Sequence, residues 1–227
     1  MPAKTTSLSP AARRIDEHSG IDALLNPAVE STEDLLPRNP TFRVDESSNK
    51  VIADRHLTNY FATIHALIPV LHEGAFRALY NGFWSRLTHQ TYSPRTDSNL
   101  QKLTEPLVYS VLSLGALYEN GYNDNAFWAK EWFARAREGI KDAVEDCSFE
   151  RCLTFYFVAS YSQHVIKPHL AYNFLGVAIR LAYSIGLNRS SVVAYCEAAW
   201  PGLGRPLFAE MCKRIWWQVI RIARSQS

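Results

Sequence analysis

AYNFLGVAIRLAYSIGLNR, residues 171–189, carries the clearest helical pattern in the sequence. Its apolar residues return every three or four positions, which is the spacing of one face of an α-helix. They are Ala171, Phe174, Ala178, Leu181, Ala182 and Ile185. Gly186 followed by Leu187 is typical of a helix end, because glycine readily adopts the left-handed conformation and the apolar residue packs back on the last turn. The stretch therefore predicts an amphipathic helix ending near Ile185.

The same spacing recurs upstream, from Asp54 to Leu87. Asp54 is a suitable N-cap for a first helix. Pro69 is expected to end or kink this helix near Ile68, because proline cannot donate the backbone hydrogen bond of a helix interior. A second apolar stripe runs from Phe76 to Leu87. These patterns predict two helices separated by a turn around Pro69.

Three further helices are predicted between that second stripe and the quoted stretch. Thr104 is expected to cap the first, which tolerates Pro106 in its first turn and stops at residues 120–121. The second is amphipathic over residues 129–144. The third follows Ser148 and is apolar on all sides, which predicts a buried, central position.

A last amphipathic helix is predicted after Pro206, running almost to the end of the sequence. Residues 1–53 carry no sustained apolar period and are rich in Pro, Ser, Thr and mixed charge, so we expect a disordered tail or linker there. No stretch alternates with the period of a strand. The sequence therefore predicts an all-α fold, an array of roughly seven mostly antiparallel helices over residues 54–227.

Composition narrows the classes of function. Lys and Arg number 24 and Asp and Glu 22, so the net charge of +2 gives no strong field for attracting a nucleic-acid backbone. The N-terminus lacks the apolar region of a secretory signal, and the longest strongly apolar stretch, residues 152–159, is far shorter than the ~20 residues that cross a bilayer. We expect an intracellular protein with no membrane span, whose four cysteines are mostly buried thiols.

Motifs for catalysis and metal binding are absent from the sequence. It contains neither the G-x-S-x-G elbow of hydrolases nor a glycine-rich phosphate loop. The candidate metal ligands are the pairs His65 and His72, His164 and His169, and Cys147 and Cys152. None has the short paired spacing of zinc sites. We therefore expect no catalytic residue, metal or cofactor in this chain.

Basic residues gather in the last predicted helix, beside two tryptophans. They are Lys213, Arg214, Arg221 and Arg224. Cations near the C-terminal end of a helix are favoured by its dipole, and this explanation is preferred to a nucleic-acid interface.

Four segments, in this order, resemble the fungal-specific transcription factor domain, or middle homology region, of zinc-cluster transcription factors. The opening pattern consists of Tyr60, Phe61, His65, Pro69, His72 and Phe76. The second is the helix segment 112–117 around Gly115. The third consists of Gly176, Ala178, Arg180, Ala182, Gly186, Leu187 and Arg189. The fourth consists of Arg214, Trp216 and Trp217. The resemblance covers about residues 55–220.

The sequence departs from the family pattern in several places. Asn188 stands where the family usually has His, and Ala66 where it often has Pro. The six-cysteine zinc cluster of the family is absent, so zinc binding and DNA reading are carried over to no residue, and DNA contact is expected only through a missing zinc-cluster domain. The family's helical domain also continues beyond the double tryptophan, so we expect a partial domain.

A partial helical array is expected to leave apolar faces uncovered and to self-associate. The residues that motivate this hypothesis are Phe208, Ile215, Trp216 and Val219.

The resemblance implies a non-enzymatic regulatory domain in the nucleus. It would control RNA polymerase II transcription through intramolecular, partner or effector contacts. A small-molecule effector would enter an apolar cavity between helices, lined by aromatic residues such as Tyr156 or Phe174. The alternatives are a helical protein-binding scaffold unrelated to transcription, a truncated competitor of a full-length regulator, and an all-helical enzyme.

Overall fold

The structure of the protein is a computed structural model. It describes residues 46–89, 96–119, 124–141, 147–189, 199–200 and 202–225. These residues all belong to one compact unit, Pro37–Ser227. The predicted tail over residues 1–53 falls mostly outside the described residues.

The described residues form seven helices of 14 or more residues and one short helix, with no strand among them. The long helices are α2 (Glu46–Ala62), α4 (Glu73–His89), α5 (Thr96–Leu117), α6 (Asn125–Glu138), α7 (Phe149–His164), α8 (Pro168–Ser184) and α9 (Arg205–Ser225). The short one is α3 (Ile64–Leu67). This confirms the predicted all-α array.

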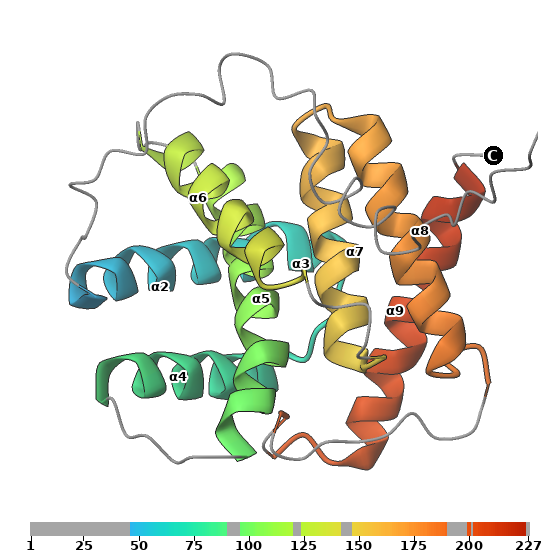
Figure 1. Cartoon of the computed structure of the whole chain (residues 1–227), viewed down its shortest axis with the longest axis horizontal. Helices are drawn as coiled ribbons and strands as arrows, with labels where there is room; N and C mark the ends of the chain where they lie inside the picture. The colour runs from blue at the N-terminus through green and yellow to red at the C-terminus, as the bar shows by residue number, and fades with distance from the viewer. Residues whose placement is uncertain are drawn as a thin grey trace, which may run out of the picture. The chain divides into compact units, whose positions relative to one another are not determined.

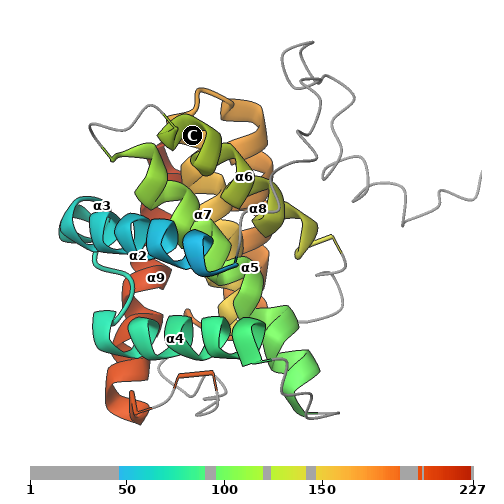
Figure 2. The same cartoon turned by 90° about the vertical axis from the view of Figure 1, so that its left-hand side faces the viewer.

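Helix α7 lies between α5 and α8 (Figure 1), and α9 packs against both α7 and α8. Helices α2 and α4 lie one above the other and cross α5 (Figure 2). Helix α6 packs mainly on α5. Helix α7 therefore contacts neighbours on several sides.

The sequence of α7 explains its central position. Thirteen of its 16 residues are buried. It begins as predicted, because the Ser148 side chain accepts a hydrogen bond from the Arg151 backbone N–H at 3.2 Å. Its two buried charged residues have partners: the Arg151 guanidinium donates to the Gly139 carbonyl at 2.7 Å, and Glu150 accepts from the Trp200 indole N–H at 2.7 Å. The prediction of a helix apolar on all sides is confirmed.

Helix α8 ends as its sequence predicts. Gly186 has a φ of 80°, in the left-handed region that favours glycine. Its N–H donates to the Tyr183 carbonyl, and the N–H of Leu187 donates to the Ala182 carbonyl. Leu187 is buried against the helix. These two bonds form the Schellman motif, which satisfies carbonyls that a helix end leaves unpaired.

Two predicted helix starts are wrong. Helix α2 begins at Glu46, so Asp54 lies inside it, where its carboxylate pairs with Lys50 one turn earlier at 2.8 Å. Helix α5 begins at Thr96, so Thr104 also lies inside a helix, and its hydroxyl donates to the Leu100 carbonyl at 2.8 Å. Side chains that can cap a helix can also bond within one, and local sequence does not distinguish the two cases.

Pro106 is consequently in the middle of α5 and not in its first turn. Its ring packs against Gly139, where an added Cβ would overlap the ring. Helix α6 ends at Glu138, so the predicted helix over residues 129–144 is too long, and Val144 lies outside the described residues. The predicted stop at residues 120–121 also lies outside them.

The structure also corrects the expectation that α9 has an uncovered apolar face. Phe208, Ile215 and Val219 are only 3%, 0% and 0% exposed, because α9 turns them toward α7 and α8. Trp216 is half-buried, with its ring 5.1 Å from that of Tyr183. The burial of these residues therefore removes the observation from which self-association was expected.

Candidate ligand-binding site

The opening segment of the family pattern extends from the end of α2 through α3 and the following turn into the start of α4. Tyr60, Phe61 and Phe76 are buried in an aromatic cluster. His65 is half-buried, and its Nε2 donates to the Leu71 carbonyl at 2.8 Å. The exposed His72 accepts a hydrogen bond from the Ala75 N–H at 3.2 Å, which caps α4. The two histidines thus hold the chain around Pro69 in place.

The later segments of the pattern divide between core and surface. In α8, Ala178 and Ala182 are buried, Gly176 is half-buried, and Arg180 is exposed. Arg189 is exposed beyond the helix end. In α9, Trp216 is half-buried, whereas Arg214 and Trp217 are exposed.

Two contacts bring separate segments of the pattern together. The exposed Arg214 donates to the Pro69 carbonyl at 3.3 Å, which joins α9 to the turn between α3 and α4. The edge-to-face contact of Trp216 with Tyr183 joins α9 to α8. Through these two contacts, the residues of the family pattern help to hold α9 against α8 and against the turn between α3 and α4.

A pocket of about 330 Å³ lies where α2, α3, α5, α7 and α9 meet. Its apolar lining residues are Ile64, Ile68, Leu114, Phe157 and Ile222. Its polar lining residues are Tyr60, Tyr156, Ser160, Gln163, His164 and Arg221. None of these lining residues is Asp or Glu. The pocket thus combines apolar surface with several hydrogen-bonding groups, a combination that small-molecule sites also have.

The phenols of the pocket lie in a weakly hydrated environment. Tyr60 is 0% exposed, and its hydroxyl has no hydrogen-bond partner among the described residues. Burial raises the pKa of Tyr60 well above its usual value, and the neighbouring Tyr156 raises it further. Burial raises the pKa of Tyr156 to about 12, while Arg221 and a hydrogen bond with Ser160 act in the opposite direction. Both phenols are therefore neutral hydrogen-bonding groups at neutral pH.

Arg221, an exposed residue of α9, is the positive charge at the edge of the pocket. Its Nε and Nη2 donate to the Gln218 side-chain oxygen at 3.2 and 2.7 Å, and this partner is neutral. His164 pairs through Nδ1 with the Tyr118 hydroxyl, and burial lowers its pKa, so it is neutral at neutral pH. The pocket consequently presents one full positive charge.

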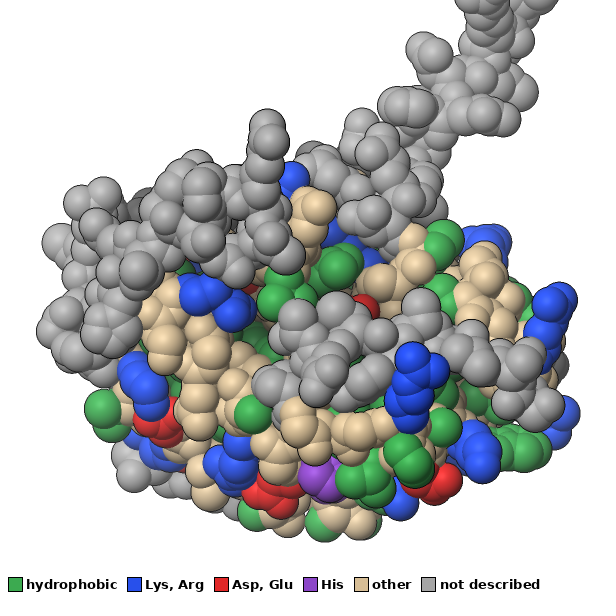
Figure 3. All heavy atoms as spheres, turned by 90° about the horizontal axis from the view of Figure 1, so that it is seen from below, with side chains coloured by type: hydrophobic (Ala, Val, Ile, Leu, Met, Phe, Trp, Pro, Cys, Tyr) green, Lys and Arg blue, Asp and Glu red, His purple; other side chains and the backbone are tan. Residues whose placement is uncertain are grey.

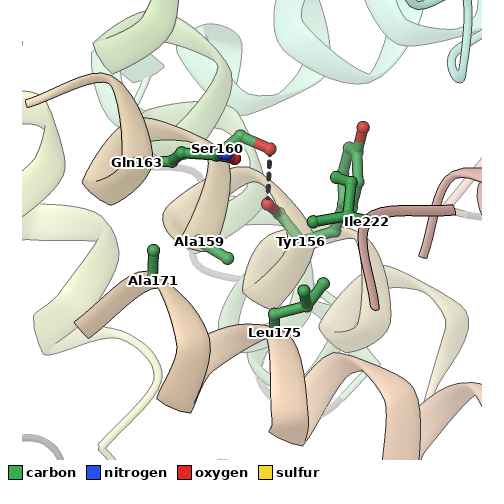
Figure 4. A pocket seen from close by; sticks show the side chains of 7 residues that line it. All are labelled: Tyr156, Ala159, Ser160, Gln163, Ala171, Leu175 and Ile222. Atoms are coloured by element: carbon green, nitrogen blue, oxygen red, sulfur yellow. Dashed lines mark hydrogen bonds between the residues drawn. The ribbon is translucent and has the colours of Figure 1, made fainter. Parts of the chain in front are cut away.

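A second, much smaller pocket shares a wall with the first. It has a volume of about 10 Å³, close to the least that can hold one water molecule. Figure 4 shows it between α7, α8 and α9, with Ala171 and Leu175 of α8 facing α7. The Ser160 hydroxyl donates to the Tyr156 carbonyl at 2.9 Å beside it. The larger pocket is therefore the one with room for a ligand.

Sequence reasoning identified only part of this site. Tyr156 lines the larger pocket as predicted, whereas Phe174 does not: it is buried and packs beside Phe155. Tyr60 was found only as part of the family pattern, and Arg221 only as a helix-end charge. Their convergence had no signal in the sequence, because they are 161 positions apart.

The candidate catalytic and metal-binding groups are dispersed. The described residues hold no group of three or more His, Cys, Asp or Glu that could bind a metal ion. Cys152 and Cys212 are buried, and burial raises the pKa of each to about 12, which disfavours the reactive thiolate. Cys147 is exposed, so it is not one of the predicted buried thiols, and Cys196 lies outside the described residues.

The basic residues of α9 form a solvated face. Arg214 pairs with Glu210, and Arg224 lies in the last turn, where the helix dipole favours it. On the face seen in Figure 3, lysine and arginine side chains are interspersed with acidic and hydrophobic ones. In the described part of the chain, no helix is long and apolar enough to cross a membrane.

A polar cluster around the buried His56 and Trp132, defined here as Arg55, His56, Glu119 and Trp132, joins α2, α6 and the segment that follows α5. The Trp132 indole N–H donates to His56 Nδ1 at 3.0 Å, and Glu119 lies 3.2 Å from His56 Nε2 and 2.7 Å from Arg55. Burial, and secondarily the Arg55 charge, lowers the pKa of His56 to about 4. This cluster was not predicted from the sequence.

The described residues thus form a helical array with a pocket between its helices. The chain belongs to the fungal specific transcription factor domain family, whose model matches residues 57–219. It is also similar to an uncharacterized transcriptional regulatory protein of Schizosaccharomyces pombe, with 26% identity over 183 residues. The match covers 80% of this chain and 22% of that protein, so the chain spans about a fifth of the relative's length. No solved structure is significantly similar to the chain.

Proposed function

We propose that the chain is a non-enzymatic regulatory domain that changes transcription by RNA polymerase II in the nucleus. It would act through contacts with protein partners, with other parts of its own protein or with a small effector. The observation that carries the proposal is the family match over residues 57–219. The relative described as a transcriptional regulatory protein supports the same role.

The burial of Cys152 and Cys212 supports a regulatory role over catalysis by these two thiols. A nucleophilic cysteine requires exposure and a lowered pKa, and Cys152 and Cys212 have neither. The near balance of basic and acidic residues supports action through contacts other than direct, charge-driven DNA binding.

A tethering experiment in yeast tests this proposal. The full chain is fused to a heterologous DNA-binding domain, alone and together with a strong activation segment, and transcription of a reporter gene is measured. We expect the chain to raise or lower reporter output severalfold relative to the same fusions without it. Unchanged output in both settings would overturn the proposal.

Two glycine variants serve as controls for folding. Gly115→Leu should abolish the effect, because a side chain at this position overlaps the backbone of α2. Gly176→Ala should retain it, because the nearest atom to an added Cβ is the end of the Arg180 side chain at 3.9 Å. An effect that survives Gly115→Leu would not come from the folded domain and would count against the proposal.

A further inference from the structure

We propose that the 330 Å³ pocket binds a small apolar molecule that carries one carboxylate group. The apolar body would pack against Ile64, Ile68 and Phe157, and the carboxylate would lie near Arg221. This proposal rests on the small-effector contact named in the proposed function, and it is tested separately from transcription.

The size of the pocket sets the size of the ligand. Its volume is at the lower end of the roughly 300–1,000 Å³ of typical small-molecule sites. A compact molecule with one ring or one branched chain fits this space. The neighbouring 10 Å³ pocket adds room for a water molecule and no more.

The Tyr60 hydroxyl is the second observation that indicates a ligand. Buried polar groups in folded proteins nearly always have a hydrogen-bond partner, and leaving one without costs stability. Tyr80 follows this rule: it is equally buried, and its hydroxyl donates to Asp54 at 2.8 Å. Tyr60 has no such partner among the described residues and lines the pocket. A ligand oxygen in the pocket would supply it.

The charges around the pocket select the ligand class. A cation is disfavoured, because Arg221 lines the pocket and none of the lining residues is acidic. A dianion such as a phosphate ester would need a second positive group, and the only other titratable base in the lining, His164, is kept neutral by burial. One positive charge among apolar walls therefore favours a monoanion.

The geometry of the Arg221 side chain allows it to donate a hydrogen bond to a ligand. Its bonds to Gln218 use Nε and Nη2, so Nη1 is not engaged in that pair. Arg221, Tyr156 and Tyr60 all line the pocket, and each side chain carries a group that can donate a hydrogen bond to a carboxylate.

Isothermal titration calorimetry on the purified full chain tests the proposal. The probes are phenylbutyrate and its neutral amide, phenylbutanamide, which differ only in the group that would face Arg221. We expect phenylbutyrate to bind with a dissociation constant below about 1 mM, and the amide at least ~10-fold more weakly. The Arg221→Gln variant should remove this preference, whereas Arg224→Gln, an exposed arginine one turn on, should preserve it.

A tyrosine pair supplies the second arm of the test. Tyr60→Phe should weaken phenylbutyrate binding at least ~3-fold, because the hydroxyl that the ligand would satisfy is lost. Tyr80→Phe should leave binding unchanged, since Tyr80 is outside the lining. The proposal is overturned if neither probe binds at about 10 mM, if acid and amide bind equally, or if the control variants act like the pocket variants. Since no transcription is measured, these outcomes leave the regulatory proposal unaffected.

Discussion

His56 and Tyr60 lie one turn apart on the same face of α2, and their polar atoms have opposite surroundings. His56 Nδ1 accepts a hydrogen bond from the Trp132 indole N–H, and Nε2 lies 3.2 Å from a Glu119 carboxylate oxygen without a hydrogen bond between them. The buried Tyr60 hydroxyl has no hydrogen-bond partner among the described residues, and Tyr60 is one of the residues that line the pocket. The comparison indicates that one end of this face stabilises the fold, while the other retains a hydrogen-bonding group for a ligand.

The position of α2 on α5 determines both regions, and Gly115 is the residue that sets it. A Cβ added here would overlap the His56 carbonyl and lie 3.2 Å from the Tyr60 Cβ. The Asn59 side chain donates to the Gly115 carbonyl at 2.7 Å, which fixes the same crossing.

The largest expected effect is therefore that of Gly115→Leu. It should lower the free energy of unfolding by about 3 kcal/mol or prevent folding, because the obstruction is backbone and cannot rotate away. Gly176→Ala should instead stabilise the chain by up to about 1 kcal/mol, since alanine favours a helix over glycine. Chemical denaturation followed by circular dichroism measures both. Equal effects of the two variants would contradict the close crossing of α2 and α5.

The next effect is a loss of stability in acid that comes from the His56 region. The pKa of this ring is about 4 in the folded chain and about 6.5 in the unfolded chain. Below pH 6.5 the unfolded state takes up a proton that the folded state does not, so stability is complete above this pH and declines toward pH 4. We expect a loss of about 2 kcal/mol between pH 7 and pH 5 from this group.

Histidine variants separate this contribution from others. The pKa of His164 is also lowered by burial, so His164→Gln should remove only part of the pH dependence, and His56→Gln the larger part. If His56→Gln fails to fold, the His56 pKa is measured directly in the unaltered chain by NMR. A value near 6.5 would show that the buried cluster does not hold the ring neutral.

A smaller effect distinguishes the two buried tyrosines. Tyr80→Phe should lower the free energy of unfolding by about 1 kcal/mol, because it removes the hydrogen bond to Asp54. Tyr60→Phe should leave it unchanged or raise it by up to about 1 kcal/mol, because the hydroxyl that it removes is buried without a partner. Urea denaturation without ligand measures both. A clear destabilisation by Tyr60→Phe would mean that the hydroxyl is satisfied in the free protein, and the contrast between the two regions would fail.

The smallest effect is expected for Trp217, which belongs to neither region. Its side chain is 64% exposed, so Trp217→Ala should change the free energy of unfolding by less than about 0.5 kcal/mol. Trp132→Phe should cost about 1 kcal/mol or more, because it leaves His56 Nδ1 without its donor. Thermal melts compare the two variants. A large loss for Trp217→Ala would mean that this residue supports the fold through contacts that its exposure does not reveal.

Local sequence determined the parts of the fold that depend on periodicity. The all-round apolar sequence of α7 predicted its burial, and Gly186 with Leu187 predicted the end of α8, because both signals are complete within a few residues. The predicted starts of α2 and α5 were wrong, because the local signal at these two places allows two interpretations. Asp54 and Thr104 can bond at a helix start or inside a helix, and the neighbouring turns that decide between these places are not a local property.

Tertiary structure alone decided the candidate site. Tyr60, Tyr156 and Arg221 come from α2, α7 and α9, and the pocket is the volume that remains between these helices after their apolar faces have packed. Periodicity tells which face of a helix is buried, but it does not tell which side chains of distant helices meet or whether they fill the space between them. The sequence thus determined the family and the helices, and the packing of the helices determined where a ligand can bind.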